Sequence, residues 1–236
     1  MNFDLAIAGW ENSTIHTSNL AAFGCPSDVD SGRLRLGYPY TTLLRDDLNS
    51  PRMLVSASYA GCSGVSNFSA FADYRLNCRT IPDNIARARG CFVASGAAPI
   101  RFAMVTDGLS HTIMVEERAI STFRDVNLFR PYKFEQTGWW FSSDDGNTIV
   151  WNRAAPNAFK TREADRSARI DAGSSLHPGG LNVLMADGSA RFVSETIESW
   201  SGEPFPAYIT ETTAIPLLWQ KLATRNGGEV FGSDNY

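Results

Sequence analysis

Three segments of the chain share one pattern, in which apolar residues alternate with polar ones around an Asp-Gly pair. The segments are 100–117, 138–151 and 181–192, and their Asp-Gly pairs are Asp107-Gly108, Asp145-Gly146 and Asp187-Gly188. Alternation with a period of two around Asp-Gly is the strongest local indication of a β-hairpin. We therefore predict an α+β protein, in which an antiparallel β-sheet of several hairpins carries long loops and few helices.

The hairpin expected at 181–192 bears on a His-Asp pair that could suggest catalysis, His177 and Asp187. The strand between them has about six residues and would span roughly 20 Å. A hydrogen bond needs about 3 Å between heavy atoms, so we expect no direct contact between the two side chains. Asp187 and Gly188 are instead predicted to be the two central residues of a type I′ turn, both with positive φ.

His177 begins the motif HPGG, which leads into the same strand. The motif is expected to form a tight turn that consists of Pro178, Gly179 and Gly180. We predict that the imidazole of His177 donates a hydrogen bond to a nearby backbone carbonyl or carboxylate and so holds this turn. The motif residues, Asp107 and Gly108 included, therefore receive a structural interpretation.

Two chemical alternatives compete with this interpretation. A hydrolase could use Ser174 or Ser175 with His177 and Asp187, but the chain lacks the G-x-S-x-G nucleophile motif. Calcium could bind carboxylate oxygens, but the candidate loops do not have the spacing of an EF-hand. These candidate ligands are Asp28, Asp30, Asp144 and Asp145. We assign no catalytic residue, no metal site and no cofactor, and expect that the protein is not an enzyme.

Six tryptophans are present, and three of them lie in the segment 138–151: Trp139, Trp140 and Trp151. Adjacent residues on a strand point to opposite faces of the sheet, so one of Trp139 and Trp140 would be exposed unless a loop covers it. An exposed tryptophan would mark a surface that binds a partner or a glycan. The alternative, which we favour, is that the core and the loops cover both side chains.

The four cysteines are Cys25, Cys62, Cys78 and Cys91, and no two of them form a C-x-x-C motif. A zinc-thiolate or dithiol redox site is therefore not expected. We predict at least one disulfide among Cys62, Cys78 and Cys91, which lie in a loop-rich stretch that would gain from covalent closure, with Cys25 unpaired. A disulfide would indicate an oxidising compartment. The alternative is four buried free thiols.

The remaining features concern the chain as a whole. Near the C-terminus, apolar residues at helical spacing predict a helix near 215–226. Hydrophobic residues make up 43% of the chain and charged ones 19%, so a single globular domain over 1–236 is expected. The net charge is −4 without a basic stripe, which argues against nucleic-acid binding. No apolar run is long enough to span a bilayer.

Six segments spread over the chain together resemble the prepilin-type, His-x9-Asp-Gly domain proteins that are abundant in planctomycete bacteria. The segments are NFD at 2–4, FGCPSD at 23–28, SYAGCSG at 58–64, MVTDGLSHTIMVEE at 104–117, HPGGLNVLMADGSARFVS at 177–194 and LATRNGGEV at 222–230. The name-giving motif has His177, Asp187 and Gly188 in place. His111 departs from the pattern, because it stands where the family usually has Asn, and the role of that side chain is open.

The resemblance implies a pilin-like headgroup fold and a structural, non-enzymatic role. We expect the extracytoplasmic headgroup of a type II secretion or type IV pilin-like (pseudopilin) subunit in the cell envelope, which assembles with itself or with other pilin-like subunits. Members usually carry an N-terminal helix that anchors them in the membrane. We expect that this chain lacks the helix, either by truncation or by nature. The runner-up is a cell-surface module that binds a glycan or a peptide, and a hydrolase ranks third.

A headgroup without its anchoring helix should expose the apolar surface that this helix would cover. The candidate surfaces are Ile100, Phe102 and Met104, and Leu181, Val183 and Met185. A closed core without an uncovered apolar face would contradict this expectation.

Overall fold

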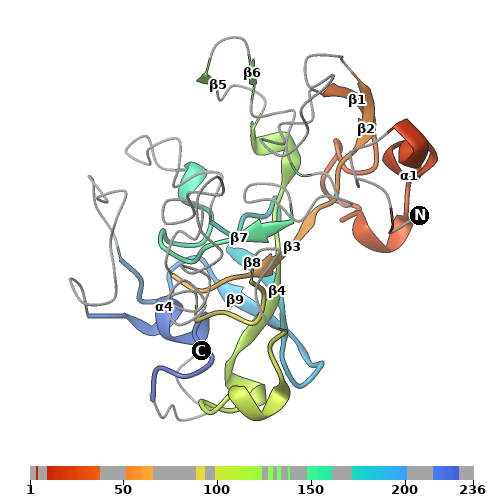
Figure 1. The fold of residues 1–236 in the computed structure, drawn as a ribbon. Helices are drawn as coiled ribbons and strands as arrows, with labels where there is room; N and C mark the ends of the chain where they lie inside the picture. Colours follow the sequence, from red (N-terminus) through yellow and green to blue (C-terminus); the bar gives the residue numbers. More distant parts are fainter. Residues whose placement is uncertain are drawn as a thin grey trace.

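The computed structural model describes residues 4, 10–37, 52–65, 89–93, 99–123, 127–129, 132–133, 138, 148–160, 172–200 and 215–228. A mixed sheet of five strands lies at its centre, with the strand order β7-β3-β4-β8-β9 (Figure 1). The strands are β3 (Tyr59–Cys62), β4 (Ile113–Glu117), β7 (Ile149–Val150), β8 (Gly180–Met185) and β9 (Ala190–Ser194). The predicted α+β class with few helices is confirmed, although β7 pairs with β3 in parallel while the other neighbours are antiparallel.

Two short ladders and several helical turns surround this sheet. β1 (Leu34–Gly37) pairs with β2 (Arg52–Val55), and β5 (Asn127–Phe129) pairs with β6 (Tyr132–Lys133). The α-helices of the described part are α1 (Ser13–Thr17) and α4 (Leu218–Leu222). Its 3-10 turns are Trp10–Asn12, Ala21–Phe23, Phe102–Met104, Leu109–His111, Ile120–Phe123 and Ala158–Lys160. None of the helices in the described part has the length and apolar character needed to cross a membrane.

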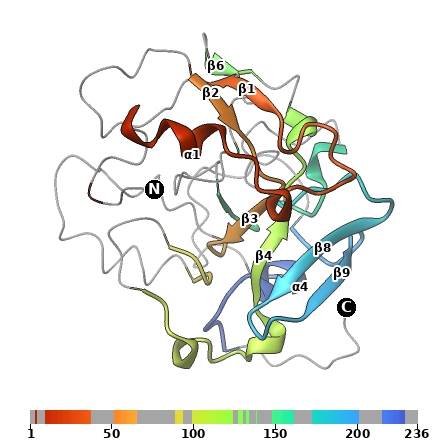
Figure 2. The same cartoon turned by 90° about the vertical axis from the view of Figure 1, so that its right-hand side faces the viewer.

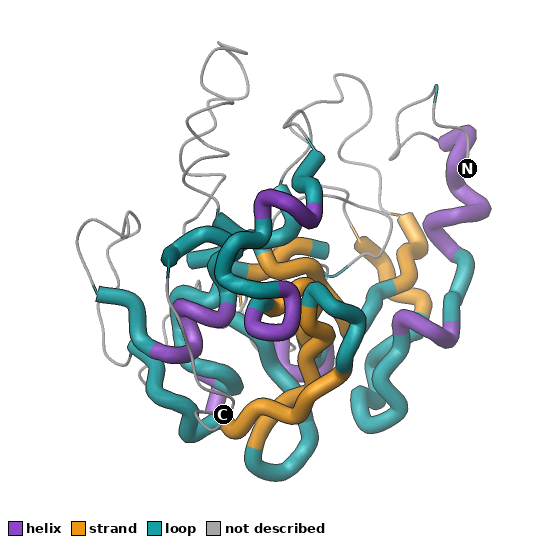
Figure 3. Tube along the Cα trace, turned by 90° about the horizontal axis from the view of Figure 1, so that it is seen from below, coloured by secondary structure: helices purple, strands orange, loops and turns teal. Residues whose placement is uncertain are grey.

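The N-terminal elements and the C-terminal helix lie toward different ends of the molecule. α1 packs against β2 at one end, beside β1, whereas β9 and α4 lie toward the other (Figure 2). Seen from below, the strands run together through the middle and are surrounded by loops and short helical turns (Figure 3). Because β4 runs antiparallel to β8, its final residue lies close to the loop that leads into β8.

The β8–β9 hairpin, predicted from the last Asp-Gly pair, is present, but its turn is not of type I′. Gly188 donates its N–H to Met185 O at 3.0 Å and has a φ of 88°. Among the described non-glycine residues only Asn157 has a positive φ, so Asp187 does not share this conformation. Its carboxylate accepts the N–H and the hydroxyl of Ser189 at 2.8 and 2.6 Å instead. The turn therefore needs one left-handed residue, which glycine supplies, rather than two.

The segment 100–117 does not form the predicted hairpin. Two short 3-10 turns lie on either side of its Asp-Gly pair, where β4 and a partner strand had been expected to meet. The physical reason is a contact with the far end of the chain. The carboxylate of Asp107 accepts the backbone N–H groups of Gly227 at 2.6 Å and Gly228 at 2.9 Å. This tertiary contact overrides the local hairpin signal.

The segment 138–151 is described only at its ends. Ile149 and Val150 form β7, which pairs in parallel with β3. Near the other end, the carbonyl of Gly138 accepts the N–H of Ala57 at 2.8 Å. The predicted turn at Asp145-Gly146 lies outside the described residues, as do Trp139 and Trp140.

The main core lies between the sheet and α4. Leu181, Val183 and Met185 point into it and pack with Trp219 and Leu222, and each of these five side chains is at most 2% exposed. The β8 face that was expected to be uncovered is therefore closed by α4, and that expectation was wrong. Burial of apolar surface contributes roughly 25 cal/mol per Å², so this cluster is a main source of stability.

The C-terminal helix is shorter than the predicted 215–226 and covers Leu218–Leu222. Ile215, which was expected on its apolar face, is 84% exposed. Ile215 precedes Pro216, and a residue before proline is disfavoured in the α conformation. Leu217 also stays extended, with a ψ of 178°, so the helix cannot begin before Leu218.

Candidate functional site

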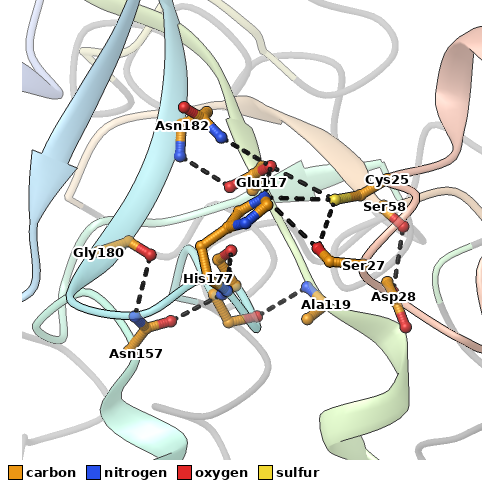
Figure 4. A network of polar contacts seen from close by, with 12 residues as sticks. Cys25, Ser27, Asp28, Ser58, Glu117, Ala119, Asn157, His177, Gly180 and Asn182 are labelled. Carbon is orange, nitrogen blue, oxygen red and sulfur yellow. Dashed lines mark hydrogen bonds and ion pairs between the residues drawn. The ribbon is translucent and has the colours of Figure 1, made fainter.

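Three segments that are far apart in the sequence meet at the end of β4 (Figure 4). Glu117 is the last residue of this strand. Cys25 and Ser27 belong to the loop that follows the 3-10 turn Ala21–Phe23, and His177 lies in the loop that leads into β8. The side chains of Cys25, Ser27, Glu117 and His177 point toward one another, and we name them the Glu117 cluster.

The imidazole Nε2 atom of His177 is the point on which the Glu117 cluster converges. It lies 3.2 Å from Glu117 Oε1, 3.4 Å from Ser27 Oγ and 3.6 Å from Cys25 Sγ. Cys25 Sγ is in turn 3.6 Å from Glu117 Oε1 and 3.0 Å from Ser27 Oγ. A thiol, a hydroxyl, a carboxylate and an imidazole therefore share one small volume.

Glu117 is held in this position by the neighbouring strand β8. Asn182 donates its backbone N–H to Glu117 Oε2 at 2.7 Å and its side-chain amide to Oε1 at 3.1 Å. The backbone carbonyl of Glu117 accepts the N–H of Ser174 at 2.8 Å. Hydrogen bonds to an ionised carboxylate are stronger than those between neutral groups, so the orientation of Glu117 is well fixed.

The loop that carries His177 is held by Asn157. Ser175 donates its N–H to Asn157 Oδ1 at 2.7 Å, and its hydroxyl accepts the backbone N–H of His177 at 3.0 Å. Asn157 has a φ of 57°, in the left-handed region that Asn adopts more readily than most residues. The position of the imidazole therefore depends on Asn157, which holds Ser175, and on Ser175, which holds the backbone of His177.

The Glu117 cluster meets solvent at His177 and Ser27, which are both partly exposed. The side chain of His177 is 33% exposed, whereas that of Glu117 is 3% exposed and Cys25 is 7% exposed. Two members of the cluster also affect the pKa of Tyr59, which lies on β3. Burial raises the pKa of Tyr59, and the charges of Cys25 and Glu117, when ionised, raise it further.

The geometry argues against a proton relay of the Ser-His-Asp type. In such a relay the histidine bonds the nucleophile through one ring nitrogen and the carboxylate through the other. Here Cys25, Ser27 and Glu117 all lie against the Nε2 atom of His177. Asp187, the carboxylate of the hydrolase hypothesis, bonds within the hairpin turn instead. The carboxylate that His177 contacts is that of Glu117.

The serines of the hydrolase hypothesis support loop backbone. The hydroxyl oxygen of Ser174 accepts the N–H of Ala119, and that of Ser175 accepts the N–H of His177, both at 3.0 Å. Both residues are buried. The Ser174 hydroxyl therefore holds the segment before β8 against the end of β4, and the Ser175 hydroxyl supports the loop from within.

Asp28, which the sequence offered as a calcium ligand, is a buried structural residue. Its Oδ2 atom accepts the N–H of Ile120 at 2.7 Å and the hydroxyl of Ser58 at 3.1 Å. Its Oδ1 atom accepts the N–H groups of Ser121 at 3.2 Å and Asp30 at 3.3 Å. Four donors thus surround the carboxylate and join the N-terminal loop to the turn after β4. Asp144 and Asp145 lie outside the described residues.

The cysteines are not joined as predicted. Cys25, Cys62 and Cys91 are free thiols, so the predicted disulfide is wrong for these residues, and Cys78 lies outside the described part. Cys62 is instead part of the core, with its Sγ atom 3.7 Å from Asn152 Oδ1. Burial raises the pKa of Cys91 to about 11 and that of Cys62 well above its ordinary value. These two thiols therefore stay protonated at neutral pH.

Of the three tryptophans considered for a binding surface, the structure describes Trp151. Trp151 follows β7 directly and is 4% exposed, so it belongs to the interior. Trp139 and Trp140 lie outside the described residues. The ligand-binding alternative therefore loses one of its three candidate side chains.

The remaining motif residues have positions set by the backbone. Gly179 and Gly108 have φ values of 83° and 101°, which L side chains rarely adopt. A Cβ atom at Gly180 would lie 2.1 Å from Val193 O, so the close pairing of β8 with β9 requires glycine there. His111, the departure from the family pattern, has its Nδ1 atom 3.0 Å from the hydroxyl of the preceding serine.

Sequence reasoning missed Ser27, Glu117, Asn157 and Asn182 as members or supports of the site. A signal for Glu117 was available, because a carboxylate at the end of the apolar strand IMVEE is expected to be buried and to need partners. The partners themselves come from separate segments and give no local signal.

Residues 2–199 match the model of a protein family, which is described as "Protein of unknown function (DUF1559)". Neither the curated proteins nor the solved structures contain a match to the chain.

Proposed function

This chain belongs to the DUF1559 family of proteins of unknown function, and we propose that it is a non-enzymatic structural subunit. More closely, we place it as the extracytoplasmic headgroup of a pilin-like (pseudopilin) assembly in the cell envelope. The resemblance of its motifs to the prepilin-type, His-x9-Asp-Gly proteins supports this proposal, as does a sheet-based fold with few helices.

The observation that carries the proposal is that buried or partly buried carboxylates accept backbone N–H groups from distant segments and so join these segments. Asp28 accepts N–H groups from the turn after β4, and Asp107 accepts them from the loop after α4. Glu117 accepts the N–H of Asn182 on β8. These three carboxylates thus hold the backbone of distant segments together, as expected of a rigid headgroup.

The exposed apolar side chains provide surface for contacts between subunits. Five of them belong to the N-terminal part that contains α1, β1 and β2, and they are 42–58% exposed: Leu20, Phe23, Val29, Leu34 and Met53. Phe102 and Met104, from the first surface that the sequence offered, are 70% and 39% exposed. Apolar side chains of this kind favour association when a partner covers them.

Site-specific photo-cross-linking in the producing bacterium tests this proposal. A photoreactive residue at Phe23 or Leu34 should yield adducts with further copies of the chain or with pilin-like subunits in the envelope fraction. The same residue at Glu198, which is exposed but polar, serves as the matched control and should yield few adducts. A chain that fractionates with the cytoplasm, or gives no adduct with itself or a pilin-like protein from the apolar positions, would contradict the assignment.

A further inference from the structure

We propose that Cys25, Glu117 and His177 form a binding site for a transition-metal ion, Zn²⁺, with one coordination position left for water. The three ligand atoms are Cys25 Sγ, Glu117 Oε1 and His177 Nε2, which all lie within 4.8 Å of one another. The inference goes beyond a structural role of the headgroup and is independent of it, because it rests only on the geometry of the Glu117 cluster.

The separations between the ligand atoms are close to those of a tetrahedral zinc site. Zinc bonds of about 2.3 Å to sulfur and about 2.1 Å to nitrogen and oxygen, at tetrahedral angles, place ligand atoms about 3.4–3.6 Å apart. In this protein Sγ lies 3.6 Å from Nε2 and 3.6 Å from Oε1, and Nε2 lies 3.2 Å from Oε1. An ion could therefore bind with little movement of the side chains.

A neutral imidazole cannot form hydrogen bonds through Nε2 with all the groups that surround this atom. The Nε2 atom of a neutral imidazole offers either one hydrogen or one lone pair, so it satisfies one partner. Glu117, Ser27 and Cys25 nevertheless all lie within 3.6 Å of that atom in His177. A cation at the centre would satisfy a thiolate, a carboxylate and the imidazole lone pair at the same time.

The charge and the chemistry of the ligands favour zinc over calcium or magnesium. A thiolate at Cys25 and the carboxylate of Glu117 carry two negative charges, which cancel the charge of a divalent ion in a largely buried site. Sulfur and nitrogen ligands are typical of zinc, whereas calcium and magnesium prefer oxygen ligands. Loss of the thiol proton accompanies metal binding, so affinity should rise with pH.

The neighbours of the cluster act as the supports that metal ligands need. Asn182 fixes both oxygens of Glu117, and Ser175 fixes the backbone of His177. Ser27 Oγ lies 3.0 Å from Cys25 Sγ and can donate to a thiolate. Hydrogen bonds of this kind orient ligands and typically change metal affinity by about 10–100-fold when they are removed.

The open side of the site is at His177, whose side chain is 33% exposed. Water can reach a fourth coordination position from there, as in zinc sites with three protein ligands. A bound ion would join the N-terminal loop, the end of β4 and the loop before β8 through a single centre.

Zinc binding by the reduced, purified chain provides the test, with a chromogenic chelator as competitor. We expect about one Zn²⁺ per chain, and affinity reduced at least about 100-fold in each of Cys25→Ser, Glu117→Gln and His177→Gln. Cobalt(II) should give a thiolate-to-metal charge-transfer band that Cys25→Ser abolishes. Matched control variants outside the cluster should bind as the wild type does: Cys91→Ser, Glu198→Gln and His111→Asn.

Alkylation of Cys25 provides a measurement that does not depend on whether a variant folds. In the wild-type protein, Zn²⁺ should slow the reaction of Cys25 with iodoacetamide at least about 10-fold, as followed by peptide mass spectrometry, and Mg²⁺ should not. Equal alkylation with and without Zn²⁺, or zinc binding that survives all three ligand substitutions, would overturn the proposal. A cluster that only forms hydrogen bonds would give equal alkylation with and without Zn²⁺.

Discussion

The carboxylate of Asp107 accepts the backbone N–H of Gly227 at 2.6 Å, so a residue that precedes β4 holds the chain that follows α4. The second oxygen accepts the N–H of Gly228 at 2.9 Å. Nearby, the carbonyl of Arg225 accepts the N–H of Thr106 at 2.7 Å. The two segments therefore form one unit, although 120 residues separate Gly227 from Asp107 in the sequence.

Replacing Asp107 with Asn should weaken this unit. The amide keeps one acceptor oxygen but loses the charge and leaves a donor facing an N–H group, so we expect a loss of about 1–3 kcal/mol in the free energy of unfolding. Urea denaturation measures the loss, and amide hydrogen exchange should become faster at Gly227 and Gly228. Glu198→Gln, at an exposed position, is the matched control. Unchanged exchange at the two glycines would show that the carboxylate does not hold this loop.

Replacing Gly188 or Gly180 with Ala should destabilise the protein to different extents, although both residues belong to the β8–β9 hairpin. Gly188 has a φ of 88°, but a Cβ atom added there would have no other atom within 4 Å, so only backbone strain of about 1–2 kcal/mol is expected. At Gly180 the new Cβ would lie 2.1 Å from Val193 O, and the strands must separate. We expect a loss above about 3 kcal/mol there, measured by chemical denaturation. Equal losses would mean that β8 and β9 can move apart easily.

A pair of double-mutant cycles should separate the two possible carboxylate partners of His177. Its imidazole is 3.2 Å from Glu117 Oε1, so His177→Ala and Glu117→Gln should show a coupling energy of about 0.5–3 kcal/mol. Asp187 bonds Ser189 at the tip of the hairpin and shares no partner with His177. The effects of His177→Ala and Asp187→Ala should therefore add. Strong coupling in the second cycle would restore a His-Asp pair.

Glu116 should make stability depend on pH. Burial raises the pKa of Glu116 to about 8 from 4.5, although Asn152 and Arg118 act to lower it. Below its unfolded pKa the carboxyl is protonated in both states and contributes no pH dependence. As pH rises from there through the folded pKa, the unfolded chain loses the proton first, so stability falls by at most about 1.4 kcal/mol per pH unit.

The variant Glu116→Gln removes this titration. It should gain stability relative to the wild type between about pH 5 and about pH 8, as followed by urea denaturation at several pH values. Glu198→Gln, at an exposed position, is the control and should follow the wild-type curve. Parallel curves for wild type and Glu116→Gln would mean that the carboxyl ionises in the folded protein as readily as in the unfolded chain.

Local patterns were sufficient for those parts of the fold that form between neighbours in the sequence. The β8–β9 hairpin follows from alternation around Asp187-Gly188, and few helices were expected. The same Asp-Gly signal failed at Asp107, because its carboxylate serves a distant loop. The Glu117 cluster could not be predicted either, since its members come from three segments whose contact depends on the complete sheet.

The order β7-β3-β4-β8-β9 also has a consequence for the speed of folding. Only β8 and β9 are joined by a short turn, whereas each of the other three pairings closes a long loop. Loop-closure entropy opposes such pairings, and proteins dominated by them fold slowly. The hairpin can form early, but Glu117 and His177 meet only after β4 has paired with β8, so the assembled cluster is a marker of that long-range pairing.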